Sequence, residues 1–143
     1  MEKKKDGMSM AERRAKGLLW VDTGENMEQQ VYARGLCQDF NRTRPTETEK
    51  RAEILQKLFA SCGEHVWIEP PLTLAMGNTV SIGKGTYINS NLTLVDDYEI
   101  NIGEDVLIAP NVTISTTNHP LHYMARPHGE MYCKKVTIES NVW

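Results

Sequence analysis

Hydrophobic residues between positions 60 and 119 recur at intervals of six. Within each group of three apolar residues the positions differ by six, and the last residue of one group is eight positions before the first of the next. The two groups are Ile82, Ile88 and Leu94, and Ile102, Ile108 and Ile114. An amphipathic helix would repeat about every 3.6 residues and a half-buried strand every two, so the spacing fits neither. It predicts short strands joined by tight turns and wound into stacked three-sided coils, whose interior these side chains fill.

The same region divides into three lines of twenty residues that match column by column. The lines begin at Ala60, Val80 and Ile100 and repeat glycine, isoleucine and threonine at fixed positions: Gly63, Gly83 and Gly103; Ile68, Ile88 and Ile108; Thr73, Thr93 and Thr113. A β-sandwich can share a loose strand spacing, but matches in at least five columns favour a true repeat. We expect the threonines to stack as a ladder, and Gly83 and Gly103 to lie in turns with positive φ.

The N-terminal part of the chain has helical patterns instead. Ser9 and Glu12 have the spacing of a capping box, residues 26–40 place Val31, Leu36 and Phe40 at roughly helical intervals, and residues 42–60 form an amphipathic pattern with a proline near its start. We therefore expect a disordered tail at residues 1–7, a helical region at 8–60, and an incomplete β-helix at 61–143 with a loop insertion at 119–135.

Besides the repeat, the chain contains several longer motifs that resemble those of a known protein family. They are MAERRAKGLLW, FNRTRPTETEKR, NLTLVDDYEINIGEDVLIAPNVTISTTNHP and GEMY. With these motifs the chain resembles, from Met8 to Trp143, the galactoside and maltose O-acetyltransferases of the hexapeptide-repeat acyltransferase superfamily. The resemblance implies a left-handed parallel β-helix, although crossover statistics alone would favour the right-handed form. It also implies a homotrimer with active sites between neighbouring subunits, and acetyl transfer from acetyl-CoA to a sugar hydroxyl.

This reaction needs a base, because a sugar hydroxyl is too weakly acidic to attack a thioester unaided. A histidine suits the role, since its unperturbed pKa of about 6.5 lets it accept and return a proton near neutrality. The resemblance assigns the role to His119, in the motif Asn118-His119-Pro120. Its structural alternative is a turn histidine before a proline. His65 is expected at a coil surface, and His122 and His128 in the wall of the insertion.

The resemblance also assigns acceptor-binding roles to five side chains: Asp22, Tyr87, Asn89, Asp97 and Met131. Carboxylates and an amide can bind sugar hydroxyls, while tyrosine and methionine supply apolar surface. Structural alternatives remain open, namely a helix cap at Asp22, a coil corner at Asn89, a solvated loop at Asp97 and simple packing at Met131.

Other residues do not determine which compound accepts the acetyl group or how acetyl-CoA, the donor, is bound. Ala75 stands where a polar residue is expected from relatives, so the acceptor could be a galactoside, maltose, glucose or a non-sugar compound. No residue has the pattern of a covalent nucleophile, so direct attack is expected and Cys133 is interpreted as incidental. Trp143 is assigned to CoA binding, with further CoA contacts and coils expected beyond it. A catalytically silent fragment with a structural or oligomerising role is the alternative.

The composition of the chain argues against nucleic-acid-binding, membrane-spanning and secreted classes of protein. The 143 residues carry a net charge of −3, which removes the electrostatic case for nucleic acid. A mean hydropathy of −0.47 and the lack of a long apolar stretch argue against a membrane span or a signal peptide. Three widely spaced cysteines fit a reducing cytoplasm. The clustering of His119, His122 and His128 in one insertion argues against zinc held between coils.

Overall fold

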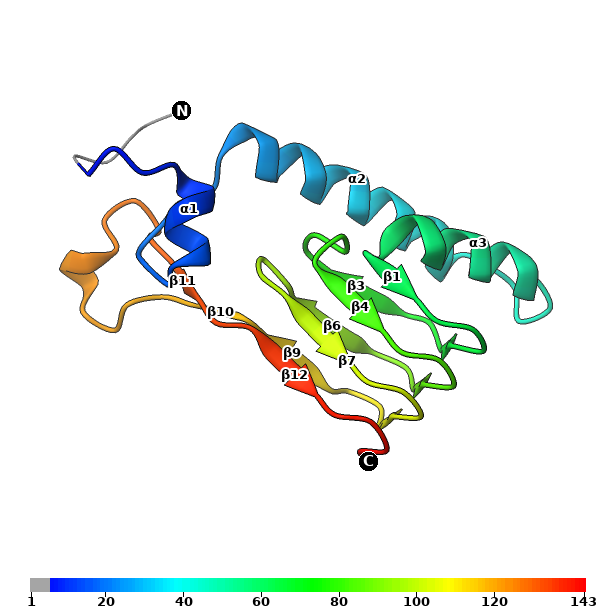
Figure 1. The fold of residues 1–143 in the computed structure, drawn as a ribbon. Helices are drawn as coiled ribbons and strands as arrows, with labels where there is room; N and C mark the ends of the chain where they lie inside the picture. Colours follow the sequence, from blue (N-terminus) through cyan, green and yellow to red (C-terminus); the bar gives the residue numbers. More distant parts are fainter. Residues whose placement is uncertain (1–5) are drawn as a thin grey trace.

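The computed structural model describes residues 6–143, in which three α-helices lead into a stack of coils made of short parallel strands (Figure 1). The helices are α1 (Met10–Ala15), α2 (Gly24–Asn41) and α3 (Thr48–Leu58). Residues 1–5 of the predicted disordered tail lie outside the described residues. The prediction of a mainly β fold behind a helical N-terminal region is therefore confirmed.

Three parallel sheets form the sides of the coils. The first contains β1 (Ser61–Cys62), β4 (Val80–Ile82), β7 (Ile100–Ile102) and β12 (Val136–Ile138). The second contains β2 (Trp67–Ile68), β5 (Tyr87–Ile88) and β8 (Leu107–Ile108), and the third contains β3 (Leu72–Leu74), β6 (Leu92–Val95) and β9 (Thr113–Ser115). Thr73 pairs with Thr93 and Thr93 with Thr113, which confirms the threonine ladder.

The predicted hydrophobic side chains form the core of the stack. All six side chains of the six-residue spacing are at most 8% exposed. Full burial of an Ile or Leu side chain stabilises a fold by about 1.5–3 kcal/mol, so each coil gains most of its stability by stacking on its neighbours. The helices cover the first coil, because Phe40 of α2 and Leu55 and Leu58 of α3 belong to the same buried cluster.

The regular spacing of the glycines within the repeat has a different cause from the one predicted. Neither Gly83 nor Gly103 has positive φ; the left-handed residues of this corner are His65, Gly85 and Asp105, two positions further on. A Cβ at Gly83 would lie 2.5 Å from the carbonyl carbon of Gly103 in the next coil. The glycine column is therefore required for close stacking of the corners, and the turn conformation is taken by the residues after it.

The helix predicted from residues 26–40 forms, but its buried face differs. Val31 is 72% exposed, whereas Ala33, Cys37 and Phe40 are buried. These three follow the i, i+4, i+7 spacing of one helix face, so small and sulfur-containing side chains pack α2 onto the first coil. Val31, whose spacing helped to indicate the helix, lies on its exposed face, whereas Phe40 lies on the buried one.

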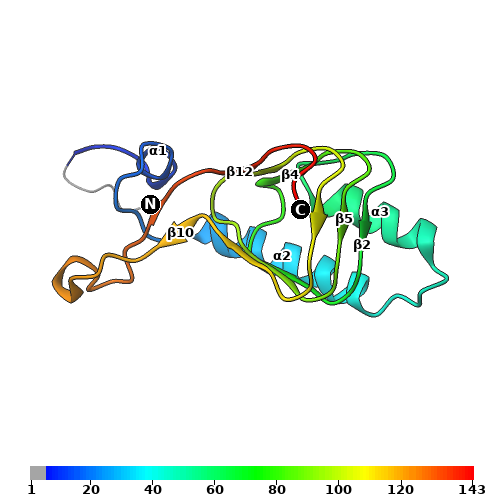
Figure 2. The ribbon, with the colours of Figure 1, turned by 90° about the horizontal axis from the view of Figure 1, so that it is seen from below.

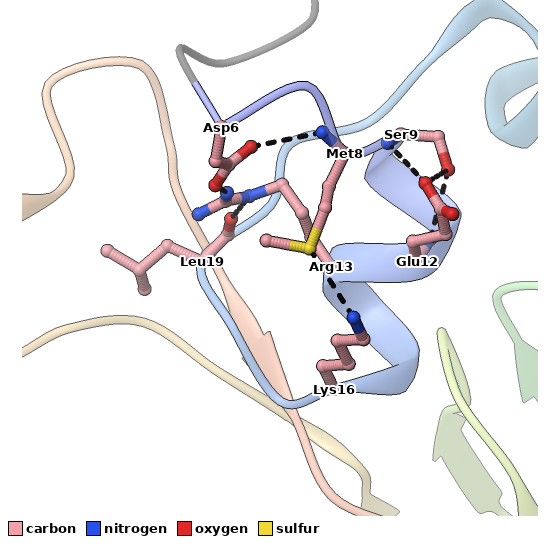
Figure 3. A network of polar contacts seen from close by, with 7 residues as sticks. All are labelled: Asp6, Met8, Ser9, Glu12, Arg13, Lys16 and Leu19. Atoms are coloured by element: carbon pink, nitrogen blue, oxygen red, sulfur yellow. Dashed lines mark hydrogen bonds and ion pairs between the residues drawn. The ribbon is translucent and has the colours of Figure 1, made fainter.

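The first helix is short and is fixed by polar contacts at both ends (Figure 3). The Ser9 hydroxyl accepts a hydrogen bond from the Glu12 backbone N–H, and the Glu12 carboxylate accepts from the Ser9 backbone N–H, which confirms the capping box. Arg13 is buried, pairs with the Asp6 carboxylate and donates to the Leu19 carbonyl. These contacts turn the chain back after α1 and determine where Trp20 lies.

The insertion leaves the coils as a hairpin. Its strands are β10 (Thr117–Asn118) and β11 (Tyr132–Cys133), which pair antiparallel, with a 3₁₀ turn at Tyr123–Ala125. The hairpin extends to the side of the stack where α1 lies (Figures 1 and 2). None of the helices between residues 6 and 143 has both the length and the apolar character that crossing a membrane requires.

Candidate active site

His119 follows β10 directly and lines a shallow hollow of about 420 Å³ together with Pro120, Arg126 and Gly129. Its ring Nδ1 lies 2.9 Å from the carbonyl oxygen of Glu130 on the other side of the hairpin. A carbonyl oxygen can only accept a hydrogen bond, so Nδ1 carries the proton in this contact. In the neutral ring Nε2 then holds the free lone pair, which is the arrangement that a general base needs.

The residue after Glu130 is joined to the N-terminal segment. The Met131 N–H donates to the Trp20 carbonyl and the Trp20 N–H donates to the Met131 carbonyl, both at 2.9 Å. Trp20 is 1% exposed, and its indole N–H lies 3.2 Å from the Cys133 sulfur. The segment that follows α1 therefore binds the part of the hairpin, Met131 to Cys133, that lies next to the residue contacted by His119.

A polar chain of contacts continues from Cys133 toward the coils. Thr117 Oγ1 donates to Asp97 Oδ2 at 2.7 Å and lies 3.4 Å from Cys133 Sγ. Asp97 is buried, so the prediction's alternative of a solvated loop is excluded for this residue. The partners of Thr117 and Trp20 are distant in the chain, so the pattern of each segment alone carries no signal for these contacts.

Asp22 lies half-buried two residues beyond Trp20. Burial raises the pKa of Asp22 above its ordinary value, and the negative charge of Asp97 raises it further, while Gln30 and Arg14 act in the opposite direction. Among the described residues, Asp22 Oδ1 and Arg14 Nη1 are shielded from solvent without a hydrogen-bond partner. The Arg14 guanidinium stacks on the Trp20 ring at 5.2 Å. Asp22, Asp97 and Met131 thus gather around the base of the hairpin that carries His119.

Asp96, the neighbour of Asp97, has a structural role. Its carboxylate is fully buried and accepts hydrogen bonds from the backbone N–H groups of Ala75, Met76 and Gly77 at 2.7–3.1 Å and from the Thr79 hydroxyl at 2.8 Å. Charge-assisted bonds of this kind compensate the cost of burying the carboxylate. Asp96 therefore fixes the coil corner that contains Ala75, and the Ala75 N–H is occupied within the chain.

Tyr87 and Asn89 lie elsewhere. Tyr87 belongs to β5 and Asn89 follows it, and β5 lies on the other side of the coil stack from β10 (Figure 2). The Asn89 side chain accepts a hydrogen bond from the Ser90 N–H at 2.8 Å, as expected for a residue at a coil corner. The physical reason for the separation is the three-sided coil, in which the second sheet faces away from the insertion. Within one chain these two residues do not meet His119.

His65, His122 and Cys133 show no arrangement for chemistry. His65 is exposed at a coil corner with φ of 58°, and His122 accepts from the Met124 N–H at its own turn. Cys133 is buried, and its burial raises the pKa of the thiol, which disfavours the nucleophilic thiolate. Among residues 6–143 no three His, Cys, Asp or Glu side chains stand close enough to hold a metal ion.

Trp143 lies at the end of the stack, away from the hairpin (Figure 1). Its side chain is 92% exposed and borders an apolar hollow of about 400 Å³. Other residues of the hollow come from the last coil: Val106, Leu107, Ile108, Ala109, Val112, Ile114, Ile138 and Val142.

Comparisons with known proteins agree with this fold. Residues 16–63 match the family model described as the maltose acetyltransferase hexapeptide capping motif. The chain is 45% identical over 137 residues to the galactoside O-acetyltransferase of Escherichia coli K12, covering 95% of this chain and 68% of that protein. It is 44% identical over 117 residues to the galactoside O-acetyltransferase of Lactococcus lactis, covering 81% of this chain and 56% of that one. A solved galactoside acetyltransferase in complex with coenzyme A superposes with a TM-score of 0.92 at 45% identity, covering 95% of this chain and 68% of the other.

The coil stack is that of the hexapeptide-repeat acetyltransferases. Within that class the chain belongs to the galactoside and maltose O-acetyltransferase family. It spans between about half and two thirds of the length of the two relatives described above, 56% of one and 68% of the other.

Proposed function

We propose that the chain transfers an acetyl group from acetyl-CoA to a hydroxyl of a galactoside, maltose or glucose type of sugar. The observation that carries the proposal is the hydrogen bond between His119 Nδ1 and the Glu130 carbonyl, which leaves Nε2 as the basic atom beside the hollow at His119. Membership of the sugar acetyltransferase family supports the substrate pair, since a relative binds coenzyme A.

In the proposed reaction the acceptor hydroxyl attacks the carbonyl carbon of the acetyl thioester while His119 Nε2 takes its proton. The C–O bond forms, and the carbonyl oxygen carries the negative charge of the tetrahedral intermediate. When the intermediate collapses, the C–S bond breaks and the CoA sulfur takes the proton back from His119. No acyl-enzyme is needed, which agrees with a buried Cys133 whose thiol pKa is raised.

On the acceptor side, we propose that Asp22 and Asp97 hydrogen-bond sugar hydroxyls and that Met131 supplies apolar contact. Asp22 Oδ1 is free of a protein partner among the described residues, and it lies close enough to Asp97 for the charge of one to affect the other. Tyr87 and Asn89 are assigned to the same acceptor but are contributed by a neighbouring subunit, because they lie far from His119 in one chain (Figure 2). This separation supports a homotrimer with sites between subunits.

The remaining assignments follow the family. We propose that the coils wind in a left-handed sense, that residues 8–60 and 61–143 form the helical and coil regions, and that Trp143 contacts CoA. The exposed indole of Trp143 beside an apolar hollow supports the last assignment. A cytoplasmic location is supported by Cys37, Cys62 and Cys133, which are all free thiols.

The experiment is acetyl-CoA turnover against galactosides, maltose and glucose, followed by the same assay with His119→Ala. Removal of a general base is expected to lower kcat about 10²- to 10⁴-fold while the fold is retained, since His119 is exposed and lies outside both buried clusters. His65→Asn serves as the control, because it replaces an exposed histidine at a corner whose φ asparagine tolerates. Undiminished turnover in His119→Ala would remove His119 from the mechanism, and absence of turnover with every sugar would refute the proposed acceptor class.

A further inference from the structure

One peptide group connects His119 to the N-terminal segment. The group between Glu130 and Met131 accepts a hydrogen bond from His119 Nδ1 through its carbonyl, at 2.9 Å. The N–H of the same group donates to the Trp20 carbonyl, also at 2.9 Å. Both polar atoms of a single peptide are therefore used, one by the proposed catalytic histidine and the other by Trp20.

The geometry of a trans peptide makes this connection rigid. The group is planar, and its C=O and N–H point in opposite directions, so fixing the N–H also fixes the direction of the carbonyl. The hydrogen bond donated by the N–H polarises the group and strengthens its carbonyl as an acceptor. The contact with Trp20 therefore controls both the position and the strength of the oxygen that binds His119.

Trp20 is itself held firmly. Its side chain is 1% exposed, its own N–H donates to the Met131 carbonyl, and its indole N–H donates to Cys133. The residue before it is fixed by Arg13, which donates to the Leu19 carbonyl (Figure 3). Cys133 is in register with Thr117, two residues before His119, so the indole also holds the paired strand.

We propose that Trp20 is a positioning residue, which fixes the tautomer and orientation of His119 through the Glu130–Met131 peptide. The proposal rests on the proposed function of His119 as the base, but its structural part can be tested without turnover. A carboxylate commonly orients a catalytic histidine from behind. Here a backbone carbonyl, held in place by a distant tryptophan, has that task.

The test is the ¹⁵N spectrum of the neutral His119 ring in wild type, Trp20→Leu and Phe40→Leu. The two variants make the same kind of change at fully buried aromatic side chains, but Phe40 belongs to the helix and coil core. Wild type and Phe40→Leu are expected to show a protonated Nδ1 and an unprotonated Nε2. Trp20→Leu is expected to move the two resonances toward each other, because both tautomers become populated, and to lower kcat about ten-fold with less than about a two-fold change in acceptor KM.

In this comparison of variants, two results would overturn the proposal: an unchanged tautomer in folded Trp20→Leu, or an equal change in Phe40→Leu. A second measurement uses the wild-type protein and covers the case in which Trp20→Leu does not fold. Scalar coupling through the hydrogen bond between the Met131 nitrogen and the Trp20 carbonyl carbon is expected, together with slow exchange of the Met131 amide proton; its absence would equally refute the relay. A protein that shows the tautomer effect but acetylates no sugar would contradict only the proposed function.

Discussion

The coils and the histidine hairpin are stabilised in opposite ways. In the coils each residue repeats a contact made by the residue twenty positions earlier, so Ile88, Ile108 and the threonine ladder form the same pairs in successive layers. The polar contacts of the hairpin have no such repeat along the chain, for example those of His119 with Glu130 and of Trp20 with Met131.

This difference affects how each region responds to change. A repeated contact is supported by identical neighbours on both sides, and its loss damages stability more than chemistry. A contact that occurs once has no substitute, so its loss changes the geometry of the site even where the fold remains. Variants of the coil corners and of the residues around Asp22 can separate the two behaviours.

The largest effect on stability is expected from Gly83→Ala. The new Cβ would lie within 2.5–2.6 Å of backbone atoms of Gly103 and Glu104, which cannot move without separating two coils. We expect a loss of about 3 kcal/mol or more in the free energy of unfolding, measured by urea denaturation. Gly35→Ala is the control, because a Cβ there meets nothing within 4 Å in a helix, and it is expected to stabilise by about 0.5–1 kcal/mol. Equal stability of the two variants would contradict the stacking role of the glycine column.

A smaller loss is expected from Asp96→Asn. The amide group would turn a donor toward backbone N–H groups that now donate to the carboxylate, so about 1–3 kcal/mol of stability is expected to be lost. Asp97→Asn changes the adjacent buried residue, whose amide oxygen can still accept from Thr117 but carries no negative charge, so it is expected to destabilise less while weakening acceptor binding more. Thermal denaturation and acceptor KM measured on both variants check the prediction. The reverse order of stability would show that Asp96 does not hold the corner.

The smallest effect is expected from Asp22→Asn and depends on pH. Burial raises the pKa of Asp22 in the folded state above its ordinary value of 3.8, so the folded state binds the proton more tightly than the unfolded state does. The contribution of Asp22 to the free energy of unfolding therefore falls as the pH rises from 3.8 through the pKa of Asp22 in the folded state. We expect Asp22→Asn to raise Tm slightly at pH 7 and to leave it unchanged near pH 3, with Asp39→Asn, an exposed site on α2, as the control. A decrease in Tm at pH 7 would contradict the sign.

Much of the coil region could be predicted from residue spacing alone. The columns of Ile, Leu and Thr determine which residues face inward and which pair, because stacking at a fixed period leaves one arrangement that buries them all. The prediction was wrong at Gly83 and Gly103, since sequence cannot distinguish a glycine needed for positive φ from one needed for a close approach. The spacing of Val31, Leu36 and Phe40 indicated the helix, but Ala33 and Cys37 also belong to its buried face and Val31 does not.

The site was less predictable. The motif around His119 and its family resemblance suggested the base, but not the Glu130 carbonyl that orients it. Asp22 and Asp97 were named as acceptor residues, and the structure brings them within electrostatic range of each other. Trp20 and Thr117 carried no signal, because their partners lie on segments that meet only in the folded chain.

The sequence by itself thus determined the stack of coils, its buried columns and the position of the inserted hairpin, because these depend on local periodicity. Only the tertiary structure decided that the segment after α1 pairs with Met131 and that Asp96 and Asp97 serve different regions. It also decided that Tyr87 lies away from His119 (Figure 2). The physical reason is that a hydrogen bond between distant segments depends on where two folded surfaces meet, and no spacing within either segment encodes that meeting.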